Sequence, residues 1–233
     1  DARENHVLAE QIREGTLPKE PFYRAMLYPW LLSQLPGGGL PQLGLLLGFA
    51  CHLLNGWLVY RLAGRLWTRP EAPVLACLLY FLNPASLFYS LQLMDITLGL
   101  SFLLGGLVIG LHRPLTLVRA LSCGLLLGLA VLTRPHFLPV ALLCPVWLWL
   151  ADGNRKAVAL AGVLPVLILL LGQGLLNQAR SGDFRMLPWQ GSYNLWAANR
   201  PGANGLYFKQ VLDLSGSGPA ENPARAESVL LYG

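Results

Sequence analysis

The feature that most constrains this chain is the near absence of acidic residues from its middle. Of the 12 Asp and Glu residues, only Glu71, Asp95 and Asp152 lie between Leu40 and Ala179. Charged residues make up 12% of the sequence and hydrophobic residues 54%, whereas a soluble globular domain contains about 25% charged residues. A long apolar stretch between two polar ends is typical of a membrane protein.

Stretches without Asp, Glu, Lys or Arg mark the candidate membrane helices. A helix needs about 20 apolar residues to cross the hydrocarbon core, and the third and fourth of the six stretches are short by this measure. They run from Leu40 to Tyr60, Ala72 to Met94, Ile96 to Leu111, Ala120 to Thr133, Pro135 to Ala151 and Ala157 to Ala179. The sequence therefore predicts an all-α, polytopic transmembrane bundle of six spans over residues 40–179.

The basic residues indicate which way this bundle faces. Six crossings place the polar segments 1–39 and 180–233 on one side of the membrane. The short loops on the other side contain seven Lys and Arg residues together with His112. The seven are Arg61, Arg65, Arg69, Arg113, Arg119, Arg155 and Lys156. Because Lys and Arg are in excess in short cytoplasmic loops, we expect both polar segments to be extracytoplasmic, with a bacterial inner membrane as the expected location.

The net charge of +5 does not indicate a nucleic-acid partner. The basic residues are spread over short loops and the two polar ends, whereas nucleic-acid-binding proteins gather them into a patch or stripe. We therefore expect membrane lipids, and no nucleic acid, among the partners. The chain opens without Met and stops without a helix stop signal, so we also expect an excerpt of a longer protein.

Two short helices are expected before the first span. The first is amphipathic, ends at Gly15 and has its apolar side formed by Val7, Leu8 and Ile12. The second, at 26–32, is apolar with aromatic residues at its rim and too short to span, which indicates an interfacial or re-entrant helix. At the other end of the chain, turn-forming residues predict an ordered outer loop over 180–233.

Three polar side chains interrupt apolar sequence on the expected outer side. Asp95 is the only acid between Ala72 and Leu111, and an acid at a membrane edge is either a functional group or a loop residue that separates two helices. Arg134 and His136 lie between the fourth and fifth spans. Arg134 either contacts phosphate oxygens or extends to lipid headgroups, and His136 can add a second bond to a phosphate.

Other polar residues inside the spans predict helix packing. His52 and Asn55 lie one helical turn apart in the first span, where hydrogen bonds to another helix are expected. Asn83 and Pro84 predict a kink in the second span. The sequence contains no P-loop, GxGxxG, HExxH or GxSxG motif, so the outer face is the place to look for chemistry.

Several of these segments together resemble the GT-C membrane glycosyltransferases of family 39, which include protein O-mannosyltransferases and the lipid A aminoarabinose transferase. The matching segments, in chain order, are DARENHVLAEQIREG at 1–15, LYPWLL at 27–32, LMDITL at 93–98, LTRP at 132–135 and GSYNLWAANRPGANG at 191–205. The chain departs from the family pattern at Ala2, where Glu is common, at Met26, where Pro is common, and at Ala198, where Gly is frequent.

The resemblance implies a sugar donor linked to polyprenyl phosphate and an acceptor hydroxyl on a lipid, protein or glycan. It implies that Asp1 is the general base or orients the acceptor, and that Asp95 is a second acid that positions the acceptor or a divalent metal. Arg134 and His136 would contact the donor phosphate. Tyr28, Tyr193, Asn194 and Asn199 would contact the substrate, and Trp189 or Trp196 would stack on the sugar unless they form part of an interfacial aromatic belt.

Two other classes of function remain open at this point. A transporter or lipid flippase would use Asp95 and Arg134 as a substrate or proton site within the bundle. A non-catalytic membrane scaffold would use its outer segments to bind another protein. A transferase differs from both because it produces a glycosylated acceptor and free polyprenyl phosphate.

Overall fold

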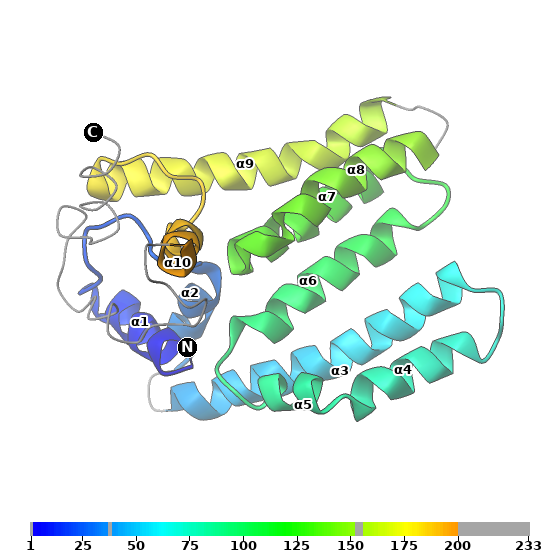
Figure 1. The fold of residues 1–233 in the computed structure, drawn as a ribbon, viewed down its shortest axis with the longest axis horizontal. Helices are drawn as coiled ribbons and strands as arrows, with labels where there is room; N and C mark the ends of the chain where they lie inside the picture. Colours follow the sequence, from blue (N-terminus) through cyan, green and yellow to red (C-terminus); the bar gives the residue numbers. More distant parts are fainter. Residues whose placement is uncertain (1, 37–38, 152–155, 200–233) are drawn as a thin grey trace. The chain divides into compact units, whose positions relative to one another are not determined.

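The computed structural model describes residues 2–36, 39–151 and 156–199 (Figure 1). By its contacts the chain divides into two compact units, which are described separately below. The first consists of residues 1–17 and 25–173, and the second of residues 18–24 and 174–233. The described residues contain no strand, so the all-helical prediction is confirmed.

The first unit is built from helices that run up and down along one another. Two of them, α1 (Ala2–Glu14) and α2 (Leu27–Ser33), precede the longer ones. The others are α3 (Leu40–Leu66), α4 (Ala72–Leu82), α5 (Pro84–Ser90), α6 (Asp95–Gly110), α7 (Leu117–Thr133), the short 3-10 helix η2 (Pro135–Phe137), α8 (Leu138–Ala151) and the first part of α9 (Lys156–Ser181).

Each of the six charge-free stretches forms a helix, but few of these helices are long. By length and composition, α3 and α9 could cross a membrane, and α4 with α5 could form a third, bent span. The apolar helices α6, α7 and 135–147 are shorter. Two or three candidate spans among the described residues support a membrane protein, whereas the six-span bundle stays a prediction.

The break predicted at Asn83 and Pro84 is present. The axes of α4 and α5 differ by 61°, because Pro84 cannot donate the backbone hydrogen bond that would continue α4. The side chain of Asn83 instead caps α5, where its Oδ1 accepts a hydrogen bond from the backbone N–H of Ala85 at 3.0 Å. Asn83 thus ends one helix and starts the next.

Packing within the first unit is closest where glycines meet a neighbouring helix. The helix α6 packs against both α3 and α7 (Figure 1). On α7, a side chain at Gly124 would collide with the carbonyl oxygen of Gly162 on α9. On α3, a Cβ atom at Gly48 would lie 2.5 Å from the carbonyl oxygen of Ser90. Small residues at such positions let helix backbones approach closely, as in membrane helix bundles.

Gly124→Ala is expected to destabilise the first unit by about 1–3 kcal/mol, because the added methyl group must push the α7 and α9 backbones apart. The matched control is Gly172→Ala, also in a helix, where a Cβ atom meets nothing within 4 Å. Thermal unfolding of the detergent-solubilised protein measures both. A Gly124→Ala midpoint equal to that of Gly172→Ala would contradict the close α7–α9 approach.

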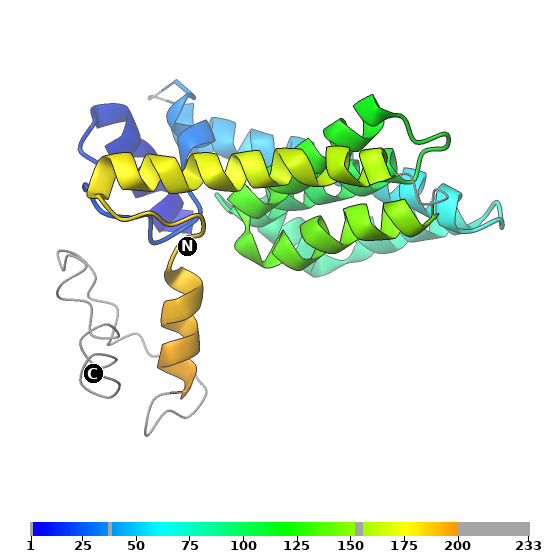
Figure 2. The ribbon, with the colours of Figure 1, turned by 90° about the horizontal axis from the view of Figure 1, so that it is seen from above.

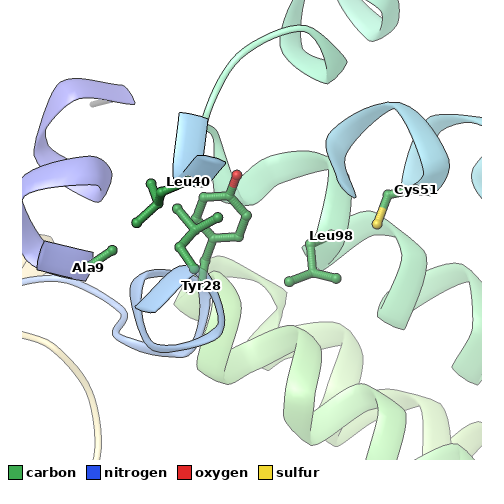
Figure 3. Close-up of a cluster of buried hydrophobic side chains, with 6 residues drawn as sticks. Ala9, Tyr28, Leu40, Cys51 and Leu98 are labelled. Carbon is green, nitrogen blue, oxygen red and sulfur yellow. The ribbon is translucent and has the colours of Figure 1, made fainter. Parts of the chain in front are cut away.

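The N-terminal helices pack onto the start of α3 and α6. Ala9, Tyr28, Leu40 and Leu98 form one buried cluster with Leu32 and Cys51 (Figure 3). The helix expected to end at Gly15 does end there, and Gly15 adopts a positive φ of 69°. Its predicted apolar side is wrong at Val7, which is 40% exposed.

The reason is that α1 buries a different face from the one its apolar residues suggest. Its fully buried positions are Asn5 and Ala9, one turn apart. A small side chain at Ala9 allows α1 to lie close against α2, and Asn5 is buried because its amide has a backbone partner, described below. Packing distance and hydrogen bonding, rather than hydrophobicity alone, selected this face.

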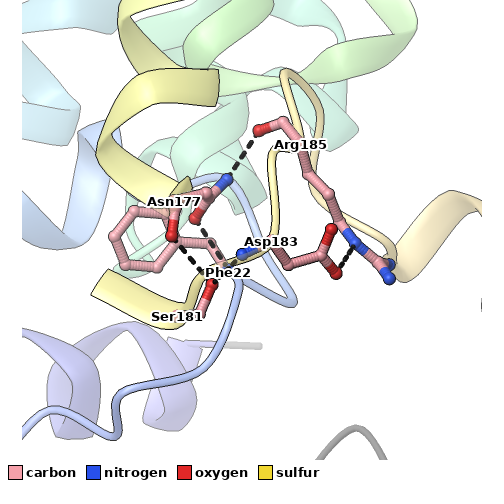
Figure 4. Close-up of polar contacts among 5 residues, drawn as sticks. All are labelled: Phe22, Asn177, Ser181, Asp183 and Arg185. Atoms are coloured by element: carbon pink, nitrogen blue, oxygen red, sulfur yellow. Dashed lines mark hydrogen bonds and ion pairs between the residues drawn. The ribbon is translucent and has the colours of Figure 1, made fainter. Parts of the chain in front are cut away.

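The second unit is organised around one buried amide. Asn177 on α9 is fully buried: its Oδ1 accepts a hydrogen bond from the backbone N–H of Phe22 at 3.2 Å, and its Nδ2 donates one to the carbonyl of Arg185 at 2.7 Å (Figure 4). Arg180 lies over the ring of Phe22 and donates a hydrogen bond to the carbonyl of Pro18 at 2.7 Å. Asn177 and Arg180 thus hold the 18–24 segment against the end of α9.

A further helix in this unit was not predicted. The segment expected to be an outer loop contains α10 (Gln190–Asn199), which follows the loop after α9 (Figure 2). Its backbone is attached to the 18–24 segment by a hydrogen bond from the N–H of Gln190 to the carbonyl of Tyr23 at 3.0 Å. The rings of Tyr23 and Trp189 pack edge to face beside it. The turn-forming sequence at 200–205 lies outside the described residues.

Asn177→Leu is expected to cost about 1–3 kcal/mol, because the N–H of Phe22 and the carbonyl of Arg185 both lose their buried partner. It should also make the 18–24 segment more susceptible to limited proteolysis. Gln178→Leu, one position along on the exposed side of α9, is the matched control. Equal proteolysis of the two variants would argue against the role of Asn177.

Candidate functional site

The first unit brings together the two strongest candidates from the sequence. Asp95 begins α6, and Arg134 follows the last residue of α7. The Nε atom of Arg134 lies 3.4 Å from Oδ2 of Asp95, with the two side chains 22% and 15% exposed. Residues far apart in sequence thus form a largely buried ion pair at one end of the unit, which we call the Asp95 end.

The local sequence explains the positions of Arg134 and Asp95. Pro135 prevents α7 from continuing, so Arg134 leaves the helix with an extended backbone. Asp95 occupies the first turn of α6, where the helix dipole favours a negative charge. The chain reverses direction between α6 and α7, and the two helices pack along each other. The end of α7 therefore lies beside the start of α6.

Gly99 is a site residue that the sequence analysis missed. It lies one helical turn after Asp95, and a Cβ atom there would be 3.1 Å from the ring of Phe137, 3.3 Å from Thr133 and 3.4 Å from Cγ of Arg134. A larger residue would therefore push the Arg134 corner away from α6. The available signal was the spacing of four residues between Asp95 and Gly99, which places both on one face of a helix.

Asn5 is a second residue that was not anticipated. Its Nδ2 donates a hydrogen bond to the carbonyl of Leu93 at 2.8 Å, two residues before Asp95. The side chain is only 4% exposed. This bond attaches α1 to the segment that leads into α6. Its partner lies 88 residues away, so the sequence contains no signal for this bond.

Two buried oxygen atoms at the Asp95 end have no hydrogen-bond partner among the described residues. They are Oδ1 of Asp95 and the hydroxyl of Tyr28. Burial is the main cause that raises the pKa of Tyr28 above its ordinary value, and the negative charge of Asp95 adds to it. Tyr28 is therefore a neutral hydroxyl at physiological pH, able to donate a hydrogen bond. Buried polar atoms normally have partners, so these two are candidates for contact with a ligand.

His136 lies on the 3-10 turn beside this pair. Its ring is exposed and packs 4.8 Å from the ring of Phe137, measured between centroids. Arg134 approaches Asp95 through Nε, and no other described carboxylate pairs with its guanidinium. A guanidinium next to an imidazole is chemically suited to phosphate oxygens.

The remaining predicted residues do not belong to the described part of the first unit. Asp1 lies outside the described residues. Tyr193, Asn194 and Asn199 lie on α10 in the second unit. Asn194 is exposed, and Nδ2 of Asn199 donates a hydrogen bond to the carbonyl of Leu195 at 2.7 Å. Their contact with a substrate stays a prediction.

A divalent metal was considered for Asp95. Over the described ranges, no three His, Cys, Asp or Glu side chains gather closely enough to hold a metal ion. Asp95 therefore has no set of further metal ligands around it in the described part of the chain.

Comparison with known proteins identified no family model, no curated protein and no solved structure that matches this chain.

A double-mutant cycle should measure the coupling between Asp95 and Arg134. Because the pair is largely shielded from water, Asp95→Asn and Arg134→Gln together should destabilise the protein less than the sum of the single effects, by about 1–3 kcal/mol. Unfolding in a denaturant series gives the four free energies. Additive effects would show that the two charges do not interact in the folded protein.

Proposed function

We propose that this protein is an integral-membrane glycosyltransferase that moves a sugar from a polyprenyl-phosphate-linked donor to an acceptor hydroxyl. The observation that carries the proposal is the Asp95–Arg134 pair, in which a carboxylate oxygen and a guanidinium both retain capacity for a ligand. An acid that orients the acceptor hydroxyl and a cation that stabilises the departing phosphate are two of the groups that such a transfer uses.

The surroundings of the pair support a donor carried on a lipid. The helices α3 and α9 are long and apolar enough to cross a membrane, and the start of α3 contributes Leu40 to the cluster that contains Tyr28. A polyprenyl chain needs an apolar surface that leads to a polar site. An apolar helix such as α3, which begins beside the buried Tyr28, supplies such a surface.

Each polar side chain of the site has a role in the proposed sugar transfer. The acceptor oxygen forms a bond to the anomeric carbon while the bond from that carbon to the phosphate oxygen breaks. The proton of the acceptor hydroxyl passes to a carboxylate, for which Asp1 is the first candidate, and Oδ1 of Asp95 accepts a hydrogen bond that orients the acceptor. Arg134, with His136, stabilises the charge that develops on the departing polyprenyl phosphate.

The neutral hydroxyl of Tyr28 would donate a hydrogen bond to the sugar or to a phosphate oxygen. Because basic residues are concentrated in the short loops at the other end, we expect the Asp95 end to face away from the cytoplasm in a bacterial inner membrane. A single displacement of this kind inverts the configuration at the anomeric carbon. Isolation of a sugar bound covalently to Asp95 or Asp1 would disprove that course.

Asp95→Asn is expected to lower polyprenyl phosphate release by at least about 100-fold, because it removes a carboxylate charge while keeping the side-chain size. The assay uses the purified full-length protein, a panel of lipid-linked sugars and a membrane extract as acceptor source. Asp1→Asn should show a similar loss, and Arg134→Lys should reduce the rate because Lys lacks the planar pair of donors.

Asp183→Asn is the matched control for this assay. Asp183 also pairs with an arginine, since its Oδ2 accepts from Nε of Arg185 at 2.6 Å, but the pair belongs to the second unit and is more exposed. Its release rate should equal that of the wild type. If no donor is consumed by the wild type while a solute or lipid crosses reconstituted vesicles, the transporter alternative replaces this proposal.

A further inference from the structure

The end of the first unit opposite Asp95 gathers basic side chains from two helices. Arg61 and Arg65 lie on the last turns of α3, and Arg119 lies on the first turn of α7. Arg65 reaches the end of α6 through the carbonyl of Val108, and α6 packs against both α3 and α7. The last turns of α3 and the first turn of α7 therefore meet the same end of α6, although 58 positions separate Arg61 from Arg119. The ends of α3 and α6 lie at the right of Figure 1.

Each of these three side chains is held in place by a separate contact. Nη1 of Arg65 donates a hydrogen bond to the carbonyl of Val108 on α6, and Nη1 of Arg119 donates one to the carbonyl of Pro114 at 2.5 Å. The guanidinium of Arg61 lies over the ring of Trp57, 5.3 Å from its centroid. The cluster is therefore positioned by the fold and does not consist of freely moving surface arginines.

Nothing in the described part of the chain neutralises this charge. No described carboxylate forms an ion pair with Arg61, Arg65 or Arg119. Glu71, in the loop between α3 and α4, is exposed and forms no ion pair with a described residue. Three guanidiniums that repel one another are stabilised by an anion. Each offers several N–H donors, and arginine is especially suited to bind phosphate oxygens.

The surface around the cluster is apolar and aromatic. Trp57, Tyr60 and Trp67 on and just after α3 are 50%, 43% and 58% exposed, and Leu117 and Val118 at the start of α7 are 53% and 71% exposed. Exposed aromatic residues at the end of an apolar helix mark the membrane interface. Since α3 is long enough to cross a membrane, its last turns lie at headgroup depth.

We propose that Arg61, Arg65 and Arg119 bind the phosphate of an anionic phospholipid, whose acyl chains lie against the exposed apolar sides of α3 and α7. Basic sites between membrane helices recognise lipid headgroups in this way. The apolar rim favours a lipid over a soluble phosphate, because a soluble anion gains nothing from exposed Trp and Leu side chains. This site does not depend on the glycosyltransferase proposal.

The test measures lipid binding to the purified full-length protein in detergent by native mass spectrometry, with dioleoylphosphatidylglycerol and dioleoylphosphatidylcholine as probes. The wild type should retain the anionic lipid in preference to the zwitterionic one. Arg61→Gln with Arg119→Gln should weaken phosphatidylglycerol binding about 30-fold, since each basic side chain near the surface contributes about fivefold. This variant leaves the bond from Arg65 to Val108 intact.

The matched control is Arg69→Gln with Arg113→Gln, which removes the same charge from loops at the same end, and it should weaken phosphatidylglycerol binding markedly less than the test variant does. If the test variant does not fold, as judged by thermal unfolding, Arg61→Lys with Arg119→Lys keeps the charge and should still weaken binding measurably by loss of the planar fork. Equal binding of both lipids by the wild type, an equal loss in the control, or displacement of the lipid by inorganic phosphate would each overturn the proposal.

Discussion

The structure depends on one requirement: polar side chains within apolar helices must find partners inside the chain. Asn55 on α3 donates a hydrogen bond to the carbonyl of Thr97 on α6 at 2.9 Å, and His52 on α3 shares one with the hydroxyl of Tyr80 on α4 at 3.1 Å. Because a buried group without a partner costs about 1–3 kcal/mol, these bonds restrict how α4 and α6 can sit along α3.

The Asp95 end is determined by the same requirement. The bond from Asn5 to the carbonyl of Leu93 ties α1 to the start of α6, and the pairing of Arg134 with Asp95 ties the end of α7 to the same place. Gly99 makes the second contact possible because it has no side chain to block the Arg134 corner. The candidate site is thus a direct result of how the helices are held together, and two of its buried oxygens lack a partner among the described residues, which suggests a ligand.

Charge divides the first unit along its length. A carboxylate and an arginine compensate each other at the Asp95 end, whereas the arginines at the far end have no described counter-charge. Such asymmetry suits a protein whose two ends meet different surroundings, a polar reaction site on one side and an anionic lipid surface on the other. The two proposals use different residues and are tested separately.

The sequence by itself determined the local features. Charge-free stretches predict helices because apolar residues must be buried in lipid or protein. The end of α1 at Gly15 and the break at Asn83 and Pro84 follow from the backbone properties of glycine and proline. The helix-to-helix bonds expected of His52 and Asn55 also followed from their isolation in apolar sequence. What the sequence could not supply was α10, whose backbone is attached to residues more than 160 positions earlier.

Only the tertiary structure decided which residues meet. It paired Asp95 with Arg134, buried Asn5 and Ala9 of α1 instead of Val7, and brought Arg119 to the same end of the first unit as Arg61 and Arg65. The physical reason is that periodicity reports which side of a helix is apolar, whereas the choice of neighbour depends on close approach at small residues and on hydrogen bonds between segments distant in sequence.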